Sequence, residues 1–390
     1  MKIRKFNVKK ENLLLFILFF IFMFLRMFSD SEYYFIQGGD SAKYLVLANN
    51  FPYHTAYNNQ LYIVHPPLYP YLIHFVSFFV EDYLAGILIS LISAAITFFI
   101  VYKLVILISN SRYVALGTLL LFSLSGIFIS ISTKVGKESF SVMLSLSSIY
   151  FLIVFLKKGK GKNIWLSAFF GALLGVTTDH VVLLIPSLIL SYVVFWNKNT
   201  LWRATIPIIS ATLSYSFWIF VRAYTYMTHE FYNVGLDGTI ANVSNWGLKQ
   251  LVSPMFFSEI QNYVPFGFNF QPLHYIYPIS YMLNLVVAPW PAGLRFSNLG
   301  ILFSTNYALQ LIIYTTLTMA AIYGTYKIIK SFFKKGIKNN GMLLSLILFT
   351  IFIFPLSQEF ISTRFTVTAI IFLFIIINYG FFQLAKHSMY

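Results

Sequence analysis

The chain has 390 residues, of which 58% are hydrophobic, 19% aromatic and only 10% charged, and its mean hydropathy is +0.74. Soluble domains carry roughly 25% charged residues, so this composition excludes a soluble globular protein, and the same figures exclude a disordered chain. The 27 basic and 12 acidic residues give a net charge of +15. The positions of these charges decide between a nucleic-acid partner and a membrane.

Apolar runs fill most of the chain, and runs of about 17 to 25 apolar residues suit helices that cross a hydrocarbon core of about 30 Å. The first run, 12–28, follows a basic leader, and no small-residue cleavage site follows it, which predicts an uncleaved anchor. Nine more spans are predicted at about 83–108, 114–132, 139–156, 164–178, 181–196, 204–221, 307–328, 342–356 and 366–385. We therefore expect an all-α polytopic membrane protein with about ten transmembrane helices.

The charges divide unevenly between the two sides of this ten-helix arrangement. With the N-terminus inside, 19 of the 27 basic residues fall on the cytoplasmic side, and 11 of the 12 acidic residues fall outside, Glu11 being the exception. Short cytoplasmic loops of membrane proteins are enriched in Lys and Arg. The pattern predicts an integral membrane protein with both termini in the cytoplasm, and it leaves no role for nucleic acid. An uncleaved chain without cysteine suits a prokaryotic inner (cytoplasmic) membrane.

Two long external loops divide the chain into three regions. Residues 1–221 form an N-terminal transmembrane module that includes the first external loop, 29–82; residues 222–306 form a large external loop; and residues 307–390 carry the C-terminal helices. The second loop contains an apolar stretch, 275–290, that resembles another span. Counting it as one would place the lysines of 327–338 outside, so an interfacial or re-entrant helix is preferred and the alternative stays open.

Asp40 is the most informative acid of the first external loop. It follows Gly38 and Gly39, which leave a turn, and Lys43 and Tyr44 continue at helical spacing. Asp40 is therefore predicted to begin a short helix along the membrane, either as a simple cap or as a reactive carboxylate. The HPPLYP segment at 65–70 follows, and its consecutive prolines argue against regular helix there.

Several short motifs then occur in a fixed order along the chain. They are GGDSAKYLVLANN (38–50), HPPLYPYLIHF (65–75), STKVGKESFSVMLSLSSIYFL (132–152), FFGALLGVTTDHVVLLIP (169–186), APWPAG (288–293) and the pair Glu359 and Arg364. In this order and on these sides of the membrane they resemble the GT-C type membrane glycosyltransferases. The resemblance is to the bacterial and archaeal relatives of protein O-mannosyltransferases and lipid A aminoarabinose transferase (glycosyltransferase family 39-like).

Two departures from that family are visible in the sequence. Asp40 is followed by Ser41, where several relatives carry an Asp-Glu pair, so a role for a second acid there is unsupported. Asp179 and His180 stand where many relatives have an Arg-containing turn.

The resemblance implies a GT-C-like bundle in which external loops and interfacial helices cover the active site on the outer face. It implies a polyprenyl-phosphate-linked sugar as donor and transfer of a hexosyl or pentosyl group, with inversion, to a glycan, lipid or protein acceptor. Asp40 is then expected to be the catalytic base, and Glu138, at the start of the fourth span, a second catalytic residue.

The candidate substrate-binding residues are Lys43, Tyr44, His65, Lys137 and Arg364. Cations at these outer positions could stabilise the departing lipid phosphate, and contact with lipid headgroups is the competing explanation for each. Tyr44, together with Tyr62, Tyr69 and Tyr71, could stack on a sugar, although an interfacial aromatic belt would explain these rings equally.

Asp40, His65, Asp179 and His180 are weak candidates for a divalent metal site, because carboxylate and imidazole are suitable ligands. Their spacing is not diagnostic, so metal dependence stays open and no other cofactor is expected. Cysteine is absent, which excludes disulfides and thiolate ligands in this sequence.

Three other classes of protein share parts of this pattern. A lipid or glycan transporter or flippase would show ionisable groups near the middle of spans and paired halves with broken helices. A membrane polysaccharide polymerase would use similar lipid-linked sugars, and a purely structural membrane protein would not need long acidic outer loops. The outer placement of the acids and the lack of paired halves argue against a transporter. The placement of Asp40 before the second span favours the glycosyltransferase over the polymerase.

Overall fold

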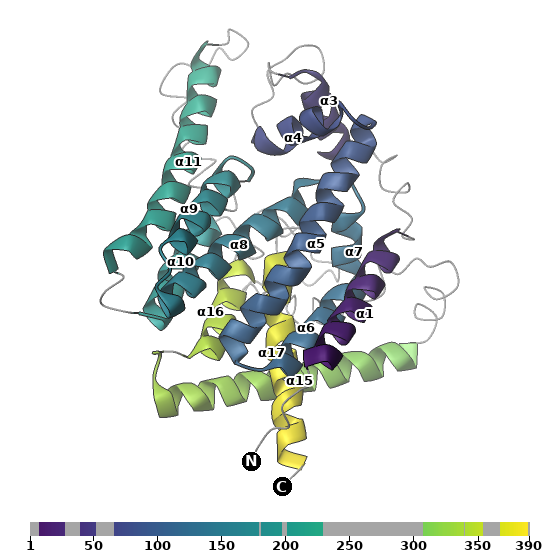
Figure 1. Ribbon diagram of the computed structural model, residues 1–390, viewed down its shortest axis with the longest axis vertical. Coiled ribbons are helices and arrows are strands. Elements are labelled where there is room, and N and C mark those ends of the chain that lie inside the picture. The colour runs from purple at the N-terminus through teal and green to yellow at the C-terminus, as the bar shows by residue number, and fades with distance from the viewer. Residues whose placement is uncertain are drawn as a thin grey trace, which may run out of the picture.

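The computed structural model describes residues 8–27, 40–51, 66–178, 181–196, 201–228, 307–338, 340–353 and 367–388. Within these ranges the chain forms thirteen helices and no strand, which confirms the predicted all-α class (Figure 1). The helices are α1 (Val8–Met27), α3 (Asp40–Asn49), α4 (Leu68–Val76), α5 (Asp82–Ser109), α6 (Arg112–Leu124), α7 (Gly126–Ser132), α8 (Lys137–Lys158), α9 (Lys162–Gly175), α10 (Val181–Val194), α11 (Leu201–Thr228), α15 (Tyr307–Lys335), α16 (Gly341–Ile353) and α17 (Val367–Ser388).

All ten predicted spans coincide with helical structure. Among the described residues, α5, α8 and α17 are long and apolar enough to cross a membrane, and α6, α10 and α16 contain shorter apolar helices. The predicted span 114–132 is interrupted at Ser125, whose φ of −68° and ψ of 119° are extended, so it consists of α6 and α7. Of the predicted external loop 222–306, only 222–228 is described, as the end of α11; the 275–290 stretch lies outside the described residues.

The helix α4 corrects the prediction for the HPPLYP segment. Regular helix was not expected before residue 71, yet α4 begins at Leu68, and Pro67 occupies its N-cap position. Pro70 is tolerated because it lies in the first turn, where a backbone N–H has no partner within the helix. A proline pair followed by a third proline therefore starts a helix here.

Local sequence explains where several helices end. Asn110 has a left-handed backbone, with φ of 53°, and ends α5. Ser111 then begins α6, and its Oγ accepts a hydrogen bond from the Val114 N–H at 3.4 Å. Gly159, with φ of 68°, ends α8 in a conformation that costs glycine little. These residues produce the short turns between consecutive spans.

The helix α8 lies at the centre of the bundle. Most of its side chains are buried, and it packs against α5, α9, α10 and α17. Between α8 and α9, the Ser148 hydroxyl donates to the Ser167 carbonyl at 2.9 Å and the Ser167 hydroxyl donates to the Ser148 carbonyl at 2.7 Å. Such polar contacts help to join helices in lipid, where apolar surface is not expelled by water. The first turn of this central helix carries Glu138.

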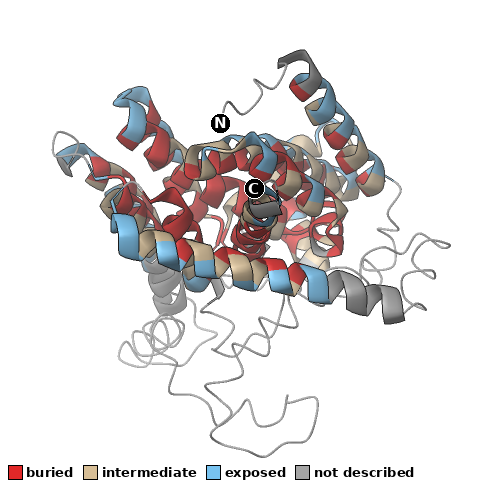
Figure 2. Cartoon of the chain, turned by 90° about the horizontal axis from the view of Figure 1, so that it is seen from below, coloured by how far each residue is buried: buried red, intermediate tan, exposed pale blue. Residues whose placement is uncertain are grey.

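Figure 2 shows exposed positions, in pale blue, along the outer sides of the helices. Many of the exposed residues are large and apolar, and they form stripes. On α5 they recur every three or four residues, so they share one helix face. The stripe consists of Leu84, Leu88, Ile92, Ile96 and Phe99, each 39–57% exposed. A continuous apolar face of this length suits lipid and would be unfavourable in water. It agrees with the predicted integral membrane protein.

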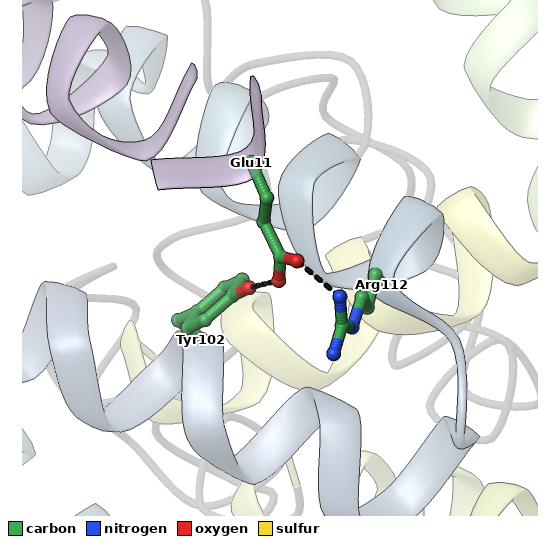
Figure 3. A network of polar contacts seen from close by, with 3 residues as sticks. All are labelled: Glu11, Tyr102 and Arg112. Atoms are coloured by element: carbon green, nitrogen blue, oxygen red, sulfur yellow. Dashed lines mark hydrogen bonds and ion pairs between the residues drawn. The ribbon is translucent and has the colours of Figure 1, made fainter. Parts of the chain in front are cut away.

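One end of the bundle carries a polar network that joins α1, α5 and α6 (Figure 3). The Tyr102 hydroxyl and the Arg112 guanidinium both donate to the carboxylate of Glu11, which is almost fully buried. At the C-terminal end of α8, the Lys157 ammonium donates to the carbonyl of Leu107. The start of α1, the start of α6 and the end of α8 therefore lie at the same end of the bundle, and the charge pattern assigned all three to the cytoplasmic side.

Candidate active site

The helix α3 is attached to the opposite end of the bundle. The Ser41 hydroxyl donates to the carbonyl of Val135 at 2.6 Å, three residues before Glu138. The ring of Tyr44 is 1% exposed and packs edge-to-face on Tyr69, with the ring centroids 5.2 Å apart. These contacts bring the predicted surface helix to the start of α8, although the two segments are far apart in the sequence.

Asp40 begins α3, as the sequence predicts. The structure describes the backbone of Asp40 but not its side chain. Since Ser41 contacts Val135, the backbone of Asp40 lies near the segment that precedes Glu138. The two predicted catalytic acids therefore belong to segments that are joined in space.

Tyr69 organises the backbone at this junction. Its hydroxyl accepts a hydrogen bond from the Gly136 N–H at 2.8 Å and donates to the Gly86 carbonyl at 3.2 Å. The Ser90 hydroxyl, 3.2 Å from the same oxygen, donates to the Gly136 carbonyl at 3.3 Å, and the Ser139 hydroxyl donates to the Ser90 carbonyl at 2.8 Å. Both backbone polar groups of Gly136 are thereby satisfied inside the protein.

Burial determines the ionisation of Tyr69. Its side chain is fully buried, and this burial raises the pKa of its hydroxyl above the ordinary value. Hydrogen bonds with Ser90 and Gly136 lower the pKa, and the negative charge of Glu138 raises it. The hydroxyl consequently keeps its proton and remains both a donor and an acceptor.

Glu138 lies in the first turn of α8, where the positive end of the helix dipole favours a carboxylate. One carboxylate oxygen, Oε2, is buried and folds back over Gly136. A Cβ atom at position 136 would collide with Oε2 and would lie 3.6 Å from Cε of Lys134. The absence of a side chain at Gly136 therefore creates the space that the Glu138 carboxylate occupies beside Lys134.

A second contact brings α4 to the end of α9. The Leu68 N–H donates to the carbonyl of Val176 at 3.2 Å. His65 lies three residues before Leu68, and Asp179 and His180 follow Val176 closely in the sequence, so the contact joins the two segments that carry these metal candidates. The three side chains themselves lie outside the described residues.

The other predicted binding residues have different positions. Lys43 in α3 and Lys137 in α8 are partly exposed near the junction, whereas Arg364 lies outside the described residues. The burial of Tyr44 is explained by packing, and its contact with a substrate stays a prediction. In the described part of the chain, no three His, Cys, Asp or Glu side chains form a metal-binding group.

Arg26 is a buried cation that the sequence interpretation did not single out. It is 2% exposed, its guanidinium lies 3.5 Å from the ring centroid of Phe22, and it donates to the carbonyls of Phe22 at 2.9 Å and Ser123 at 3.4 Å. The second bond supports the end of α6, just before the break at Ser125. The sequence could have identified Arg26, because an ionisable residue inside an apolar span usually faces the protein interior.

Two comparisons with known proteins agree with this architecture. Residues 64–222 match the family model described as dolichyl-phosphate-mannose-protein mannosyltransferase. This segment runs from just before α4 into α11 and includes Tyr69, Gly136 and Glu138, whereas Asp40 precedes it. The comparison with curated protein sequences found no match.

The fold is similar to that of a solved archaeal enzyme. The crystal structure is that of the Archaeoglobus fulgidus oligosaccharyltransferase complex with Zn and sulfate, with a TM-score of 0.52 and 11% sequence identity. The match covers 96% of this chain and 49% of that protein, so the chain spans about half its length. At this identity the likeness shows the fold alone. Together with the family match, it confirms the resemblance to GT-C type membrane glycosyltransferases that the motifs predicted.

Proposed function

We propose that the chain is a glycosyltransferase that moves a sugar from a polyprenyl-phosphate-linked donor to a glycan, lipid or protein acceptor. The observation that supports this most directly is the hydrogen bond from Ser41 to Val135. It joins the helix that begins at Asp40 to the segment that leads into Glu138. Two acids chosen from the sequence for the same reaction thus belong to one junction.

In the proposed reaction, Asp40 accepts the proton of the acceptor hydroxyl as its oxygen attacks the anomeric carbon of the sugar. The bond between that carbon and the lipid phosphate breaks, the configuration inverts, and the polyprenyl phosphate leaves with the bonding electrons. Lys43 and Lys137 are proposed to stabilise the departing phosphate, and Glu138 to orient the acceptor. His65 and Arg364 remain candidates for donor contacts.

The test uses the full chain in nanodiscs with a panel of polyprenyl-phosphate sugars and simple acceptors. Donor consumption and donor-induced thermal stabilisation are measured for the wild type, Asp40→Asn and Glu138→Gln. A bound donor raises the melting temperature because it binds only the folded protein. Glu81→Gln is a matched control, since Glu81 is an exposed acid at the start of α5, and it is expected to keep full activity.

If the proposal is correct, Asp40→Asn is stabilised by the donor but does not consume it. A wild type that binds the donor and moves it between leaflets without consuming it would support a flippase instead. Repeating the assay with a chelator and then with added Mg²⁺, Mn²⁺ or Zn²⁺ tests the proposed metal site around Asp40, His65, Asp179 and His180. Loss and recovery of turnover would support a metal, and unchanged turnover would argue against one.

A further inference from the structure

The helix α15 lies across the bundle, whereas α5 and α17 run along it (Figure 1). In the view from below, α15 again extends across the picture (Figure 2). It crosses α17 where Gly324 and Gly380 allow close approach: an added Cβ at Gly380 would meet the carbonyl oxygen of Ala320, and one at Gly324 would meet that of Ile376. The crossing lies in the C-terminal half of α17, toward the end of the bundle that carries the Glu11 network.

Two opposite faces of α15 differ in what they contact. One face is buried in the protein and consists of Leu317, Ala320, Gly324 and Ile328. The other face is an exposed apolar stripe that consists of Met319, Ile322, Tyr326, Ile329 and Phe333, each 41–80% exposed. With 3.6 residues per turn, the stripe lies directly opposite the buried face. The stripe therefore needs an apolar environment outside the described protein.

The charges of α15 are confined to one flank and to its end. Lys327, Lys330 and Lys334 recur at spacings of three and four residues between the two faces, and Lys335 and Lys338 follow. Lys327 lies over the rings of Tyr323 and Tyr326, at 5.0 and 6.0 Å, and the Lys330 ammonium donates to the Tyr326 hydroxyl at 3.4 Å. The sequence 307–338 contains no acidic residue. Tyrosine beside lysine is typical of the headgroup layer of a membrane.

We propose that α15 is a membrane-surface helix that lies in the headgroup layer of the cytoplasmic leaflet and binds anionic lipid. The apolar stripe contacts acyl chains, the buried face contacts α17, and the lysine flank contacts negatively charged headgroups. Charge complementarity identifies this partner, because a lysine flank without acids beside an apolar stripe fits an anionic bilayer surface. The proposal does not depend on the proposed enzymatic function.

The proposal changes the preferred topology of the preceding segment. If α15 lies at the cytoplasmic surface instead of crossing the membrane, the chain between the outer end of α11 and α15 must cross the membrane an odd number of times. The 275–290 stretch lies outside the described residues. Of the two alternatives that the sequence leaves open for it, a transmembrane span is the one that gives an odd number of crossings. In this topology, in which the chain crosses the membrane before α15 instead of within it, the lysines of 327–338 and the C-terminus remain cytoplasmic. The enrichment of Lys and Arg on the cytoplasmic side is therefore kept.

The depth of α15 in the bilayer is the first test. Because the chain has no cysteine, single cysteines can be introduced at the five stripe positions and spin-labelled in the full protein, reconstituted in nanodiscs. Depth is measured by comparing relaxation by oxygen with relaxation by a water-soluble nickel complex. Residues 319 and 333 are about 21 Å apart along a helix axis, so a spanning helix would show a steep depth gradient.

The proposal expects similar, shallow depths at all five positions. The matched control is the exposed stripe of α5, from Leu84 to Phe99, which has similar spacing on a spanning helix and is expected to show the gradient. A gradient on α15 would overturn the proposal. Free access of the nickel complex at every α15 position would also overturn it, because the stripe would then lie in water or outside the lipid.

The second test concerns the lipid charge. The labels on α15 are compared in nanodiscs of phosphatidylcholine alone and of an equal mixture with phosphatidylglycerol, and they are expected to become deeper and less mobile in the mixture. Replacing Lys327, Lys330 and Lys334 by Gln should remove this response. Replacing the exposed Lys158, Lys160 and Lys162 by Gln removes the same charge elsewhere and should leave it unchanged. Equal responses in the two triple variants would overturn the lipid-binding assignment.

The third test concerns sidedness. A membrane-impermeant maleimide should label Ser297→Cys from the cytoplasmic side, as it should the control Lys160→Cys, whereas Asn59→Cys should react from the outside. Labelling of Ser297→Cys only from the outside would overturn the proposed topology, in which the chain crosses the membrane before α15 and α15 does not cross it. It would favour the original prediction that α15 crosses the membrane.

Discussion

Replacing Tyr69 by Phe removes one hydroxyl group from the junction of α4, α5 and α8. The ring remains, so its packing against Tyr44 is preserved, but the hydrogen bonds to Gly136 and Gly86 are lost. The N–H of Gly136 then stays buried without this acceptor. Leaving a buried donor unsatisfied costs about 1–3 kcal/mol, and we expect the free energy of unfolding to fall by about this amount.

The unfolding free energy can be measured by titrating the protein with SDS in mixed micelles and following circular dichroism. Tyr192→Phe is the matched control, because the Tyr192 hydroxyl in α10 is buried and has no hydrogen-bond partner among the described residues. Removing that hydroxyl should leave stability unchanged or raise it slightly. The two variants lose the same atoms, so their difference isolates the hydrogen bonds of Tyr69.

The same variant tests the link between the Tyr69 network and the proposed chemistry. Since Tyr69 holds Gly136, and Glu138 folds over Gly136, Tyr69→Phe should also reduce donor turnover while donor-induced thermal stabilisation remains. Equal unfolding free energies for Tyr69→Phe and Tyr192→Phe would refute the reasoning about the buried network. A stability loss with normal turnover would limit Tyr69 to a structural role.

Three further changes test other parts of the structure. Gly136→Ala places a methyl group against the carboxylate of Glu138, and turnover of the donor should fall about tenfold, equivalent to about 1.4 kcal/mol of barrier; unchanged turnover would show that Glu138 is not needed in this position. Glu11→Gln removes the ion pair with the half-exposed Arg112 and should lower the free energy of unfolding by about 0.5–1 kcal/mol in low salt and less in high salt; an effect independent of salt would contradict this origin. Gly380→Val overfills the crossing with α15 and should cost about 1–3 kcal/mol in SDS unfolding; a neutral result would mean that the helices do not approach closely there.

The sequence alone determined the all-α class of the protein and the approximate bounds of the apolar helices. This was possible because the hydrocarbon core imposes a length and a composition on any helix that crosses it. It also identified the start of α3 at Asp40, since local glycine and capping signals mark a helix terminus. The motif order pointed to the GT-C resemblance that the family match and the fold comparison confirm.

Local signals were less reliable where tertiary packing competes with them. The proline-rich start of α4 was interpreted as irregular, although Pro70 fits the first turn of a helix. The break at Ser125 was not predicted, because an apolar run from 114 to 132 contains no proline. Arg26 helps to support that break through the carbonyl of Ser123, a contact between residues far apart in the chain.

Only the tertiary structure decided which segments meet at the candidate site and how α15 lies. Tyr69 could be a sugar-stacking ring or part of an aromatic belt by sequence, and its hydrogen bond to Gly136 instead makes it part of the buried support for the start of α8. At the crossing of α15 and α17, Gly324 and Gly380 lie where an added Cβ would collide with the backbone of the facing helix. Hydropathy identifies the apolar helices. The direction in which a helix runs depends on which of its surfaces can pack closely against another helix, and this depends on pairs of residues that are distant in the sequence.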